Sequence, residues 1–75
     1  MEFLNEKEVE QIRQIYTKGT IIELISMDDP YTKLVSGDRG IVDHVDDAGQ
    51  IHVRWDRGSS LALIPEIDSF KIVEK

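Results

Sequence analysis

The chain has 75 residues, with fifteen acidic and nine basic side chains, a net charge of −6 and no cysteine. This length suits one small domain that buries about 60% of its unfolded surface, which leaves little room for a deep active site. Disulfides and thiolate metal sites are excluded, and the acidic balance disfavours non-specific binding to phosphate backbones. The charged N-terminus and the lack of any run of ~20 apolar residues predict a soluble, cytoplasmic protein with no membrane partner.

The first predicted element is an amphipathic helix over residues 6–17. Asn5 and Glu8 have the spacing of a capping box, and Gly19 supplies a residue able to end the helix. About twelve residues make a marginal helix alone, so its apolar stripe must dock. We expect docking within the chain; the alternatives are another copy or a partner protein. The stripe comprises Val9, Ile12, Ile15 and Tyr16, with Phe3 and Leu4 able to extend it.

Short β-branched or alternating segments follow the helix and predict five strands. One helix followed by five closely spaced strands indicates a small barrel over residues 20–75, with residues 1–19 packed on or beside it. The predicted strands are TIIELIS (20–26), GIVDHV (40–45), QIHVRW (50–55), SLALI (60–64) and SFKIV (69–73). A short helical turn is expected between the last two strands, after Pro65, because proline cannot donate to a sheet ladder.

The second and third predicted strands form a hairpin whose register can be derived from its loop. A three-residue loop, Asp47-Ala48-Gly49, with Gly49 at positive φ, pairs Asp46 with Gln50. Continuing that register would put a charged residue in the core unless a bulge intervenes near Asp43 and His44. The predicted pairs are Val45 with Ile51, His44 with His52, Val42 with Val53 and Gly40 with Trp55.

Residues 34–42, LVSGDRGIV, contain two glycines, as phosphate loops do, but they precede a strand rather than a helix and have no following Lys-Ser/Thr. We therefore predict a tight turn with positive φ at Gly37, whereas Gly40 should either let the barrel bend or let a bulky neighbour such as Trp55 lie over the backbone. Asp38 should accept local amide hydrogen bonds. Arg39 should project from the turn as the member most free to bind a partner.

The loop, meander, one-turn helix and closing strand from about Thr20 to Val73 resemble an SH3-like barrel. More closely, GDRGIV, HVDDAGQIHVRWD and LIPEIDSF resemble a family of small uncharacterised bacterial proteins, a domain of unknown function often carried by phages and mobile elements. Peptide-binding SH3 domains present an aromatic groove, to which only Tyr31, Trp55 and Pro65 could contribute here. Recognition of proline-rich peptides is therefore disfavoured.

The sequence offers little for chemistry. It has no cysteine, its serines lie in turns or at strand ends, and its paired aspartates occur where turns use them, so we predict neither an enzyme nor a cofactor. His44 and His52, with Asp43 or Asp46, could approach one metal ion. Two solvent-facing histidines on a hairpin are more often unliganded, so no metal is predicted.

We expect a noncatalytic protein-interaction module, monomeric or weakly dimeric, with an unknown protein partner. One alternative is an acidic inhibitor that occupies a basic, nucleic-acid-binding surface of another protein. The other is weak nucleic-acid binding through a patch of Lys33, Arg39, Arg54 and Arg57 with Tyr31 and Trp55. The predicted binding surface, on and beside a long loop, comprises Asp28, Asp29, Tyr31, Lys33, Arg39, Trp55 and Arg57.

Overall fold

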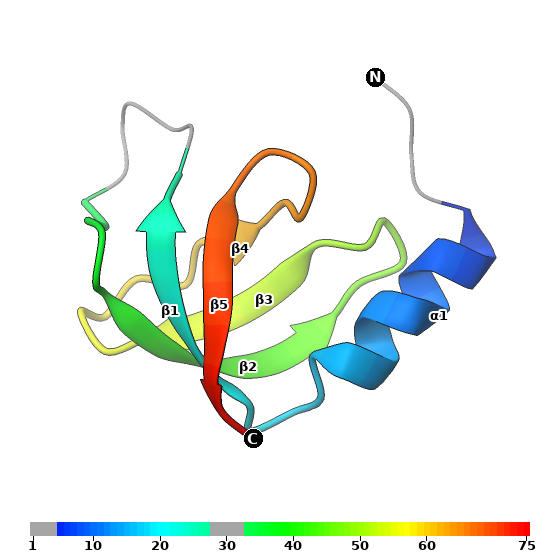
Figure 1. Cartoon of the computed structure of the whole chain (residues 1–75), viewed down its shortest axis with the longest axis horizontal. Helices are drawn as coiled ribbons and strands as arrows, with labels where there is room; N and C mark the ends of the chain where they lie inside the picture. The colour runs from blue at the N-terminus through cyan, green and yellow to red at the C-terminus, as the bar shows by residue number, and fades with distance from the viewer. Residues whose placement is uncertain (1–4, 28–32) are drawn as a thin grey trace.

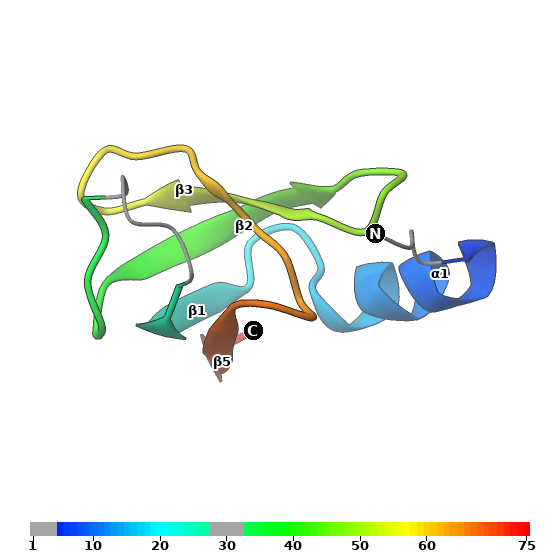
Figure 2. The same ribbon diagram turned by 90° about the horizontal axis from the view of Figure 1, so that it is seen from above.

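The computed structural model describes residues 5–27 and 33–75, which form one helix and a five-stranded antiparallel sheet (Figure 1). The strand order is β4-β3-β2-β1-β5, and the sheet curls so that β1 and β5 lie on one side and β3 on the other (Figure 2). In chain order the elements are α1 (Glu6–Ile15), β1 (Ile21–Ser26), β2 (Arg39–Val45), β3 (Ile51–Trp55), β4 (Ala62–Leu63) and β5 (Ser69–Glu74). No helix in these two ranges has the length and apolar character needed to cross a membrane.

The predicted capping box starts α1. The Asn5 side chain accepts from the Glu8 amide at 2.9 Å, and the Glu8 carboxylate accepts from the Asn5 amide at 3.3 Å. The helix ends at Ile15, two residues before the predicted end, because Tyr16 has left helical geometry with φ −103° and ψ 72°. Its amide still donates to the Ile12 carbonyl at 2.8 Å, which closes the last turn.

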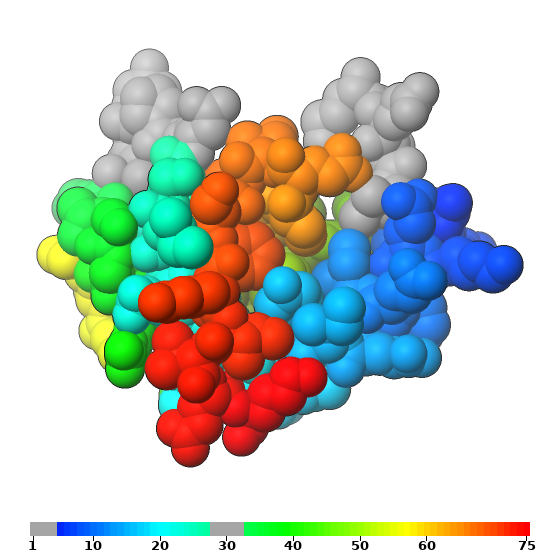
Figure 3. All heavy atoms as spheres, viewed as in Figure 1, coloured from blue at the N-terminus to red at the C-terminus, as the bar shows by residue number. Residues whose placement is uncertain are grey.

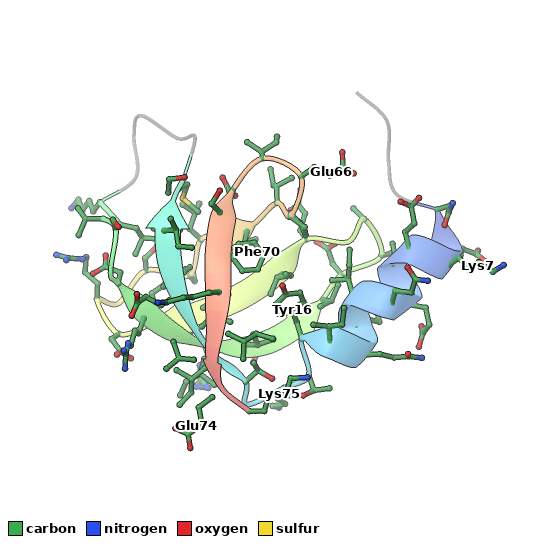
Figure 4. All side chains as sticks on the ribbon, viewed as in Figure 1. Lys7, Tyr16, Glu66, Phe70, Glu74 and Lys75 are labelled. Atoms are coloured by element: carbon green, nitrogen blue, oxygen red, sulfur yellow. The ribbon has the colours of Figure 1, made fainter. Side chains whose placement is uncertain are left out.

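The apolar stripe of α1 packs against the sheet of the same chain. Val9 is 3% exposed and belongs to the core, and the rings of Tyr16 and Phe70 point toward one another with centroids 5.4 Å apart (Figure 4). Arg13 ties the helix to the end of β2 by donating to the Val45 carbonyl at 3.3 Å and to Asp47 at 2.8 Å. Docking on the sheet therefore supplies the stability that so short a helix lacks alone. Phe3 and Leu4 lie outside the described residues.

The predicted hairpin register is confirmed throughout. Asp46 donates its amide to the Gln50 carbonyl at 3.0 Å, Gly49 has φ 84°, and a register shift falls between Val42 and His44, as the bulge predicts. The shift keeps five apolar residues of the two strands on the inner face: Val42, Val45, Ile51, Val53 and Trp55. The observed pairs include Val45 with Ile51, His44 with His52, Val42 with Val53 and Gly40 with Trp55.

The fourth strand is shorter than predicted, with two residues in place of five. It ends in a hydrogen-bonded turn in which the amides of Ile67 and Asp68 both donate to the Ile64 carbonyl, at 3.0 and 2.8 Å. The Asp68 carboxylate accepts a hydrogen bond from the Ile64 amide at 2.8 Å. Leu63 faces the core and is fully buried, so this short strand still closes one end of the inner face.

The core lies inside the curled sheet and holds residues from β1, β2, β3 and β4, together with Val9 of α1 and Leu34 of the segment before β2. Strand alternation explains its membership, because every second residue of a strand points inward. The buried apolar residues are Val9, Ile22, Leu24, Leu34, Val42, Val45, Ile51, Val53, Trp55 and Leu63.

Gly40 is the point of closest approach between β2 and β3. A Cβ atom placed there would lie 2.5 Å from Val53 Cγ1, 2.9 Å from the Arg54 carbonyl oxygen and 3.0 Å from Trp55 Cα. Two of those atoms belong to the backbone and cannot move alone. Of the two reasons predicted for a glycine here, the close neighbour is the one observed, and its nearest side-chain atom belongs to Val53 rather than to the indole of Trp55.

We predict that Gly40→Ala lowers the free energy of unfolding by about 1–3 kcal/mol, through overpacking against β3. Urea unfolding followed by tryptophan fluorescence measures the change. Ile41→Val, at the next position of the same strand, removes one methylene from an outward, half-exposed side chain and keeps its β-branching, so it serves as the control and should unfold close to the wild type. Equal midpoints for wild type and Gly40→Ala would contradict the close approach.

Candidate functional site

The structure removes Trp55 from the predicted binding surface. Its side chain is 4% exposed, and the indole Nε1 donates to the Leu61 carbonyl at 2.9 Å. Trp55 was predicted as a member of a binding surface, but it is buried because it shares the inner face of β3 with Ile51 and Val53 at a spacing of two. Lys33 is exposed. The other loop members of that surface, Asp28, Asp29 and Tyr31, lie outside the described residues.

Arg39 is not the free cation that the sequence predicts. The pairing of β1 with β2 sets it opposite Glu23, and its Nε donates to Glu23 Oε1 at 3.0 Å. Lys71, from β5 on the other side of β1, approaches the second oxygen of Glu23 at 3.6 Å. Glu23 therefore lies between two cations, and the hydrogen bond from Arg39, followed by the charge of Lys71, outweighs desolvation and lowers the pKa of the Glu23 carboxyl.

Arg57 is also engaged within the chain. Its Nε and a terminal guanidinium nitrogen donate to the two oxygens of Asp38, both at 2.9 Å, in the bidentate geometry that arginine favours. Asp38 also accepts from the Val35 amide at 2.9 Å, as predicted for a turn aspartate. The hydrogen bond from Arg57, and then that from Val35, lower the pKa of the Asp38 carboxyl. The pair joins the turn before β2 to the turn after β3.

His44 and His52 lie opposite one another, as predicted, with parallel rings whose centroids are 4.3 Å apart. His44 Nδ1 is 2.7 Å from Asp43, and His52 Nε2 is 2.8 Å from Asp46. Nitrogen lone pairs lie in the plane of an imidazole, so stacked parallel rings do not direct them at one ion. Among the described residues no group of three or more metal-ligating side chains is placed to hold a metal.

Asp46 is the centre of the hairpin turn. One carboxylate oxygen accepts from the amides of Ala48 at 3.0 Å and Gln50 at 2.9 Å, and the other contacts His52. Desolvation acts to raise the pKa of Asp46, but these hydrogen bonds outweigh it and the net shift is downward. Asp46 therefore has a structural role, because each of these hydrogen bonds joins it to another residue of the same hairpin.

A surface that the sequence analysis missed lies on the outward side of β1, β2 and β5. In one row across the strands, Ile41 pairs with Ile21, Ile21 pairs with Glu74, and Val73 lies in the bulge of β5 next to Glu74. Ile41 is 46% exposed and Val73 38%. Two positions along β1 from Ile21, Glu23 lies between Arg39 and Lys71 and forms the second row. We call this surface the outer face; it comprises Ile21, Glu23, Arg39, Ile41, Arg54, Lys71, Val73 and Glu74.

The outer face is open to solvent. Figure 3 shows β1 and β5 nearest the viewer, with α1 beside them rather than over them, and Figure 1 shows the same arrangement of ribbons. Exposed aliphatic side chains beside partly neutralised ions suit noncovalent binding to another macromolecule. A signal for this face exists in the sequence: TIIELIS has apolar residues on both faces of the strand, where one buried face needs only every second residue.

These features define a small, mainly-β domain with one N-terminal helix and an exposed apolar and ionic face. The chain belongs to the family described as a domain of unknown function, DUF4314, whose model matches residues 5–73. The predicted membership of a family of unknown function is confirmed. No curated protein and no solved structure matches the chain.

The Asp38–Arg57 pair predicts a pH-dependent contribution to stability. The pKa of Asp38 in the folded state lies below its ordinary value of 3.8, so the contribution is present above about pH 4 and is lost as the pH falls through the folded-state pKa. We expect Asp38→Asn to unfold at lower urea than the wild type at neutral pH, and the difference to shrink below about pH 4.

Urea unfolding at a series of pH values measures that difference. The control is Asp56→Asn, which removes an exposed carboxylate for which no ion pair is seen in the described part of the chain. Its difference from the wild type should change little over the same range. A difference for Asp38→Asn that stays constant well below pH 4 would argue against the ion pair.

Proposed function

We propose that the protein is a noncatalytic protein-interaction module that binds its partner through the outer face. The observation that carries the proposal is that Ile21, Ile41 and Val73 come together from three strands, with Ile41 and Val73 exposed and Ile21 partly exposed. Exposed apolar side chains are common singly, but a contiguous row across neighbouring strands marks a surface suited to burial by a partner.

The ion pairs favour a protein partner over nucleic acid. Three of the arginines in the described residues already donate to carboxylates of the same chain: Arg13 to Asp47, Arg39 to Glu23 and Arg57 to Asp38. Each pair reduces the positive potential that would attract a phosphate backbone. Trp55 is buried and cannot stack on a base. Of the patch considered from the sequence, Arg39 and Arg57 are therefore already paired within the chain and Trp55 is buried.

We also infer that the curled sheet is an SH3-like barrel. Three observations support this: β1 pairs with both β2 and β5, β2 and β3 form a tight hairpin, and a single turn joins β4 to β5. In such a barrel the inner faces of the strands make the core, and the outer faces and loops remain available for binding.

The proposal is tested by affinity capture from a lysate of the source organism, using the full chain and analysing both protein and nucleic acid. We expect a protein partner with the wild type, and its loss with the double variant Ile41→Ser/Val73→Ser, because both changes remove apolar area from the outer face. The matched control is Ile67→Ser, at an isoleucine that is also about half exposed (49%) but lies in the turn between β4 and β5.

Circular dichroism and urea unfolding establish that each variant is folded. Equal recovery with the double variant and the control would refute the outer face as the binding surface. If that complex were also dissociated by salt, it would favour the acidic inhibitor instead. Recovery of nucleic acid without protein would refute the interaction module itself.

A further inference from the structure

The edge of the sheet at β5 is a surface distinct from the outer face. The strand order begins at β4 and ends at β5, and β5 pairs with β1 on one side. Among residues 5–27 and 33–75, no strand pairs with the other side of β5, and no ladder joins β5 to β4. An unpaired edge presents a row of backbone N–H and C=O groups that one further strand can satisfy. We call this side of β5 the free edge.

The pairing of β1 shows which residues of β5 direct their backbone groups toward the free edge. The amide and the carbonyl of Leu24 each form a 2.8 Å hydrogen bond with the turn before β2, so both point away from β5. Backbone groups of successive residues point to opposite sides of a strand, so those of Glu23 point toward β5, where Glu23 pairs with Lys71. Lys71 therefore directs its own groups toward β1. The groups of its two neighbours, Phe70 and Ile72, face the free edge.

The opposite edge of the sheet, at β4, is protected against such pairing. β4 comprises Ala62–Leu63 alone, and side chains occupy the amides on either side of it. The Leu61 amide donates to the Ser59 hydroxyl at 3.2 Å. The Ile64 amide donates to the Asp68 carboxylate at 2.8 Å. Sheets avoid edge pairing by such means, whereas β5 has six residues and neither protection within the described part of the chain.

Partly buried apolar side chains line the inner side of the free edge. Phe70 and Ile72 pack against the core yet stay partly exposed. Tyr16 is also partly exposed, and the centroid of its ring lies 5.4 Å from that of Phe70, on the same side of β5 as α1 (Figure 4). Side chains of paired residues face the same side of a sheet, so apolar residues of an added strand would cover these three side chains.

The position of α1 decides which kind of partner fits the free edge. The helix projects from the sheet on that side of β5 (Figures 1 and 2). A second folded sheet placed edge to edge with β5 would therefore meet α1, whereas a single strand needs a width of about 4.8 Å beside β5. The free edge is thus suited to a peptide segment rather than to a second copy of this chain.

We propose that the free edge binds an extended peptide segment of another protein as a sixth strand. The segment pairs its backbone with that of Phe70 and Ile72, and it presents apolar side chains at every second position to these two residues and to Tyr16. This inference goes beyond the proposed function, because the outer face binds through outward side chains and the free edge binds through the backbone of β5.

Amide hydrogen exchange in the full chain, followed by NMR, tests whether the edge is free. Of three neighbouring amides, that of Lys71 donates to β1, whereas those of Phe70 and Ile72 face the free edge. We therefore expect the Phe70 and Ile72 amides to exchange faster than the Lys71 amide. A bound peptide should slow the exchange of both.

The binding probe is a synthetic peptide of alternating valine and threonine with a lysine at each end. Two N-methylated forms of it have the same charge and the same side chains, one methylated on the valine amides and the other on the threonine amides. In an extended peptide one of these sets faces β5 and the other faces solvent. We expect one form to bind like the parent peptide and the other to bind at least about 10-fold more weakly.

A pair of variants makes the same test from the side of the protein. Ile72→Pro removes an amide that faces the free edge and none that donates to β1, so the protein should remain folded. Ile72→Ala is the matched control, because it loses the same side-chain contacts but keeps the amide. The parent peptide should bind Ile72→Pro at least about 10-fold more weakly than Ile72→Ala. Circular dichroism establishes folding, and if Ile72→Pro is unfolded, the two methylated peptides decide the question with the unaltered protein.

The inference is overturned if the parent peptide does not bind, if the two methylated forms bind equally, or if folded Ile72→Pro and Ile72→Ala bind equally. Slow exchange of Phe70 and Ile72 in the free protein would also overturn it. Exchange that slows as the protein concentration rises would assign the edge to a second copy instead. The capture experiment with Ile41→Ser/Val73→Ser tests the outer face, so the free edge and the proposed function fail separately.

Discussion

The ladder between β2 and β3, with its one-residue shift between Val42 and His44, is the constraint on which the rest of the structure depends. In a strand with a period of two, that shift decides which side chains enter the core. It places Val42 and Val45 inside, brings Gly40 against Trp55, and turns His44 outward onto His52. Without the shift, alternation from Val42 would put His44 on the inner face, and alternation from Val45 would put Asp43 there.

The same alternation creates the outer face as a consequence of building the core. Once Gly40 and Val42 face inward, Arg39 and Ile41 must face outward, and the pairing with β1 sets them beside Glu23 and Ile21. Arg39 therefore pairs with Glu23, because Glu23 is the carboxylate directly opposite it on β1. The described residues contain one helix that could cover the sheet. This helix, α1, lies beside β1 and β5 rather than over them (Figures 1 and 2). The outer face remains uncovered for that reason.

Sequence reasoning predicted the fold well where the signals are local. Capping geometry, positive φ at turn glycines and hairpin register depend on residues a few positions apart, so they can be derived without knowing the rest of the chain. The predicted binding surface was less accurate. Trp55 was assigned to the binding surface because the buried face of β3 was not deduced from the neighbouring residues. Arg39 was expected to be free because its pairing with Glu23, sixteen residues earlier in the chain, was not deduced.

By itself the sequence determined the capping box of α1, the Asp46–Gly49 turn, the bulge and the close approach at Gly40, each from the stereochemistry of a short segment. The tertiary structure alone decided which carboxylate each arginine meets, that Trp55 is buried, and that aliphatic side chains from three strands gather on one exposed face. These features arise from contacts between segments far apart in the chain. They depend on how the sheet curls and in what order its strands lie, which no local pattern of residues specifies.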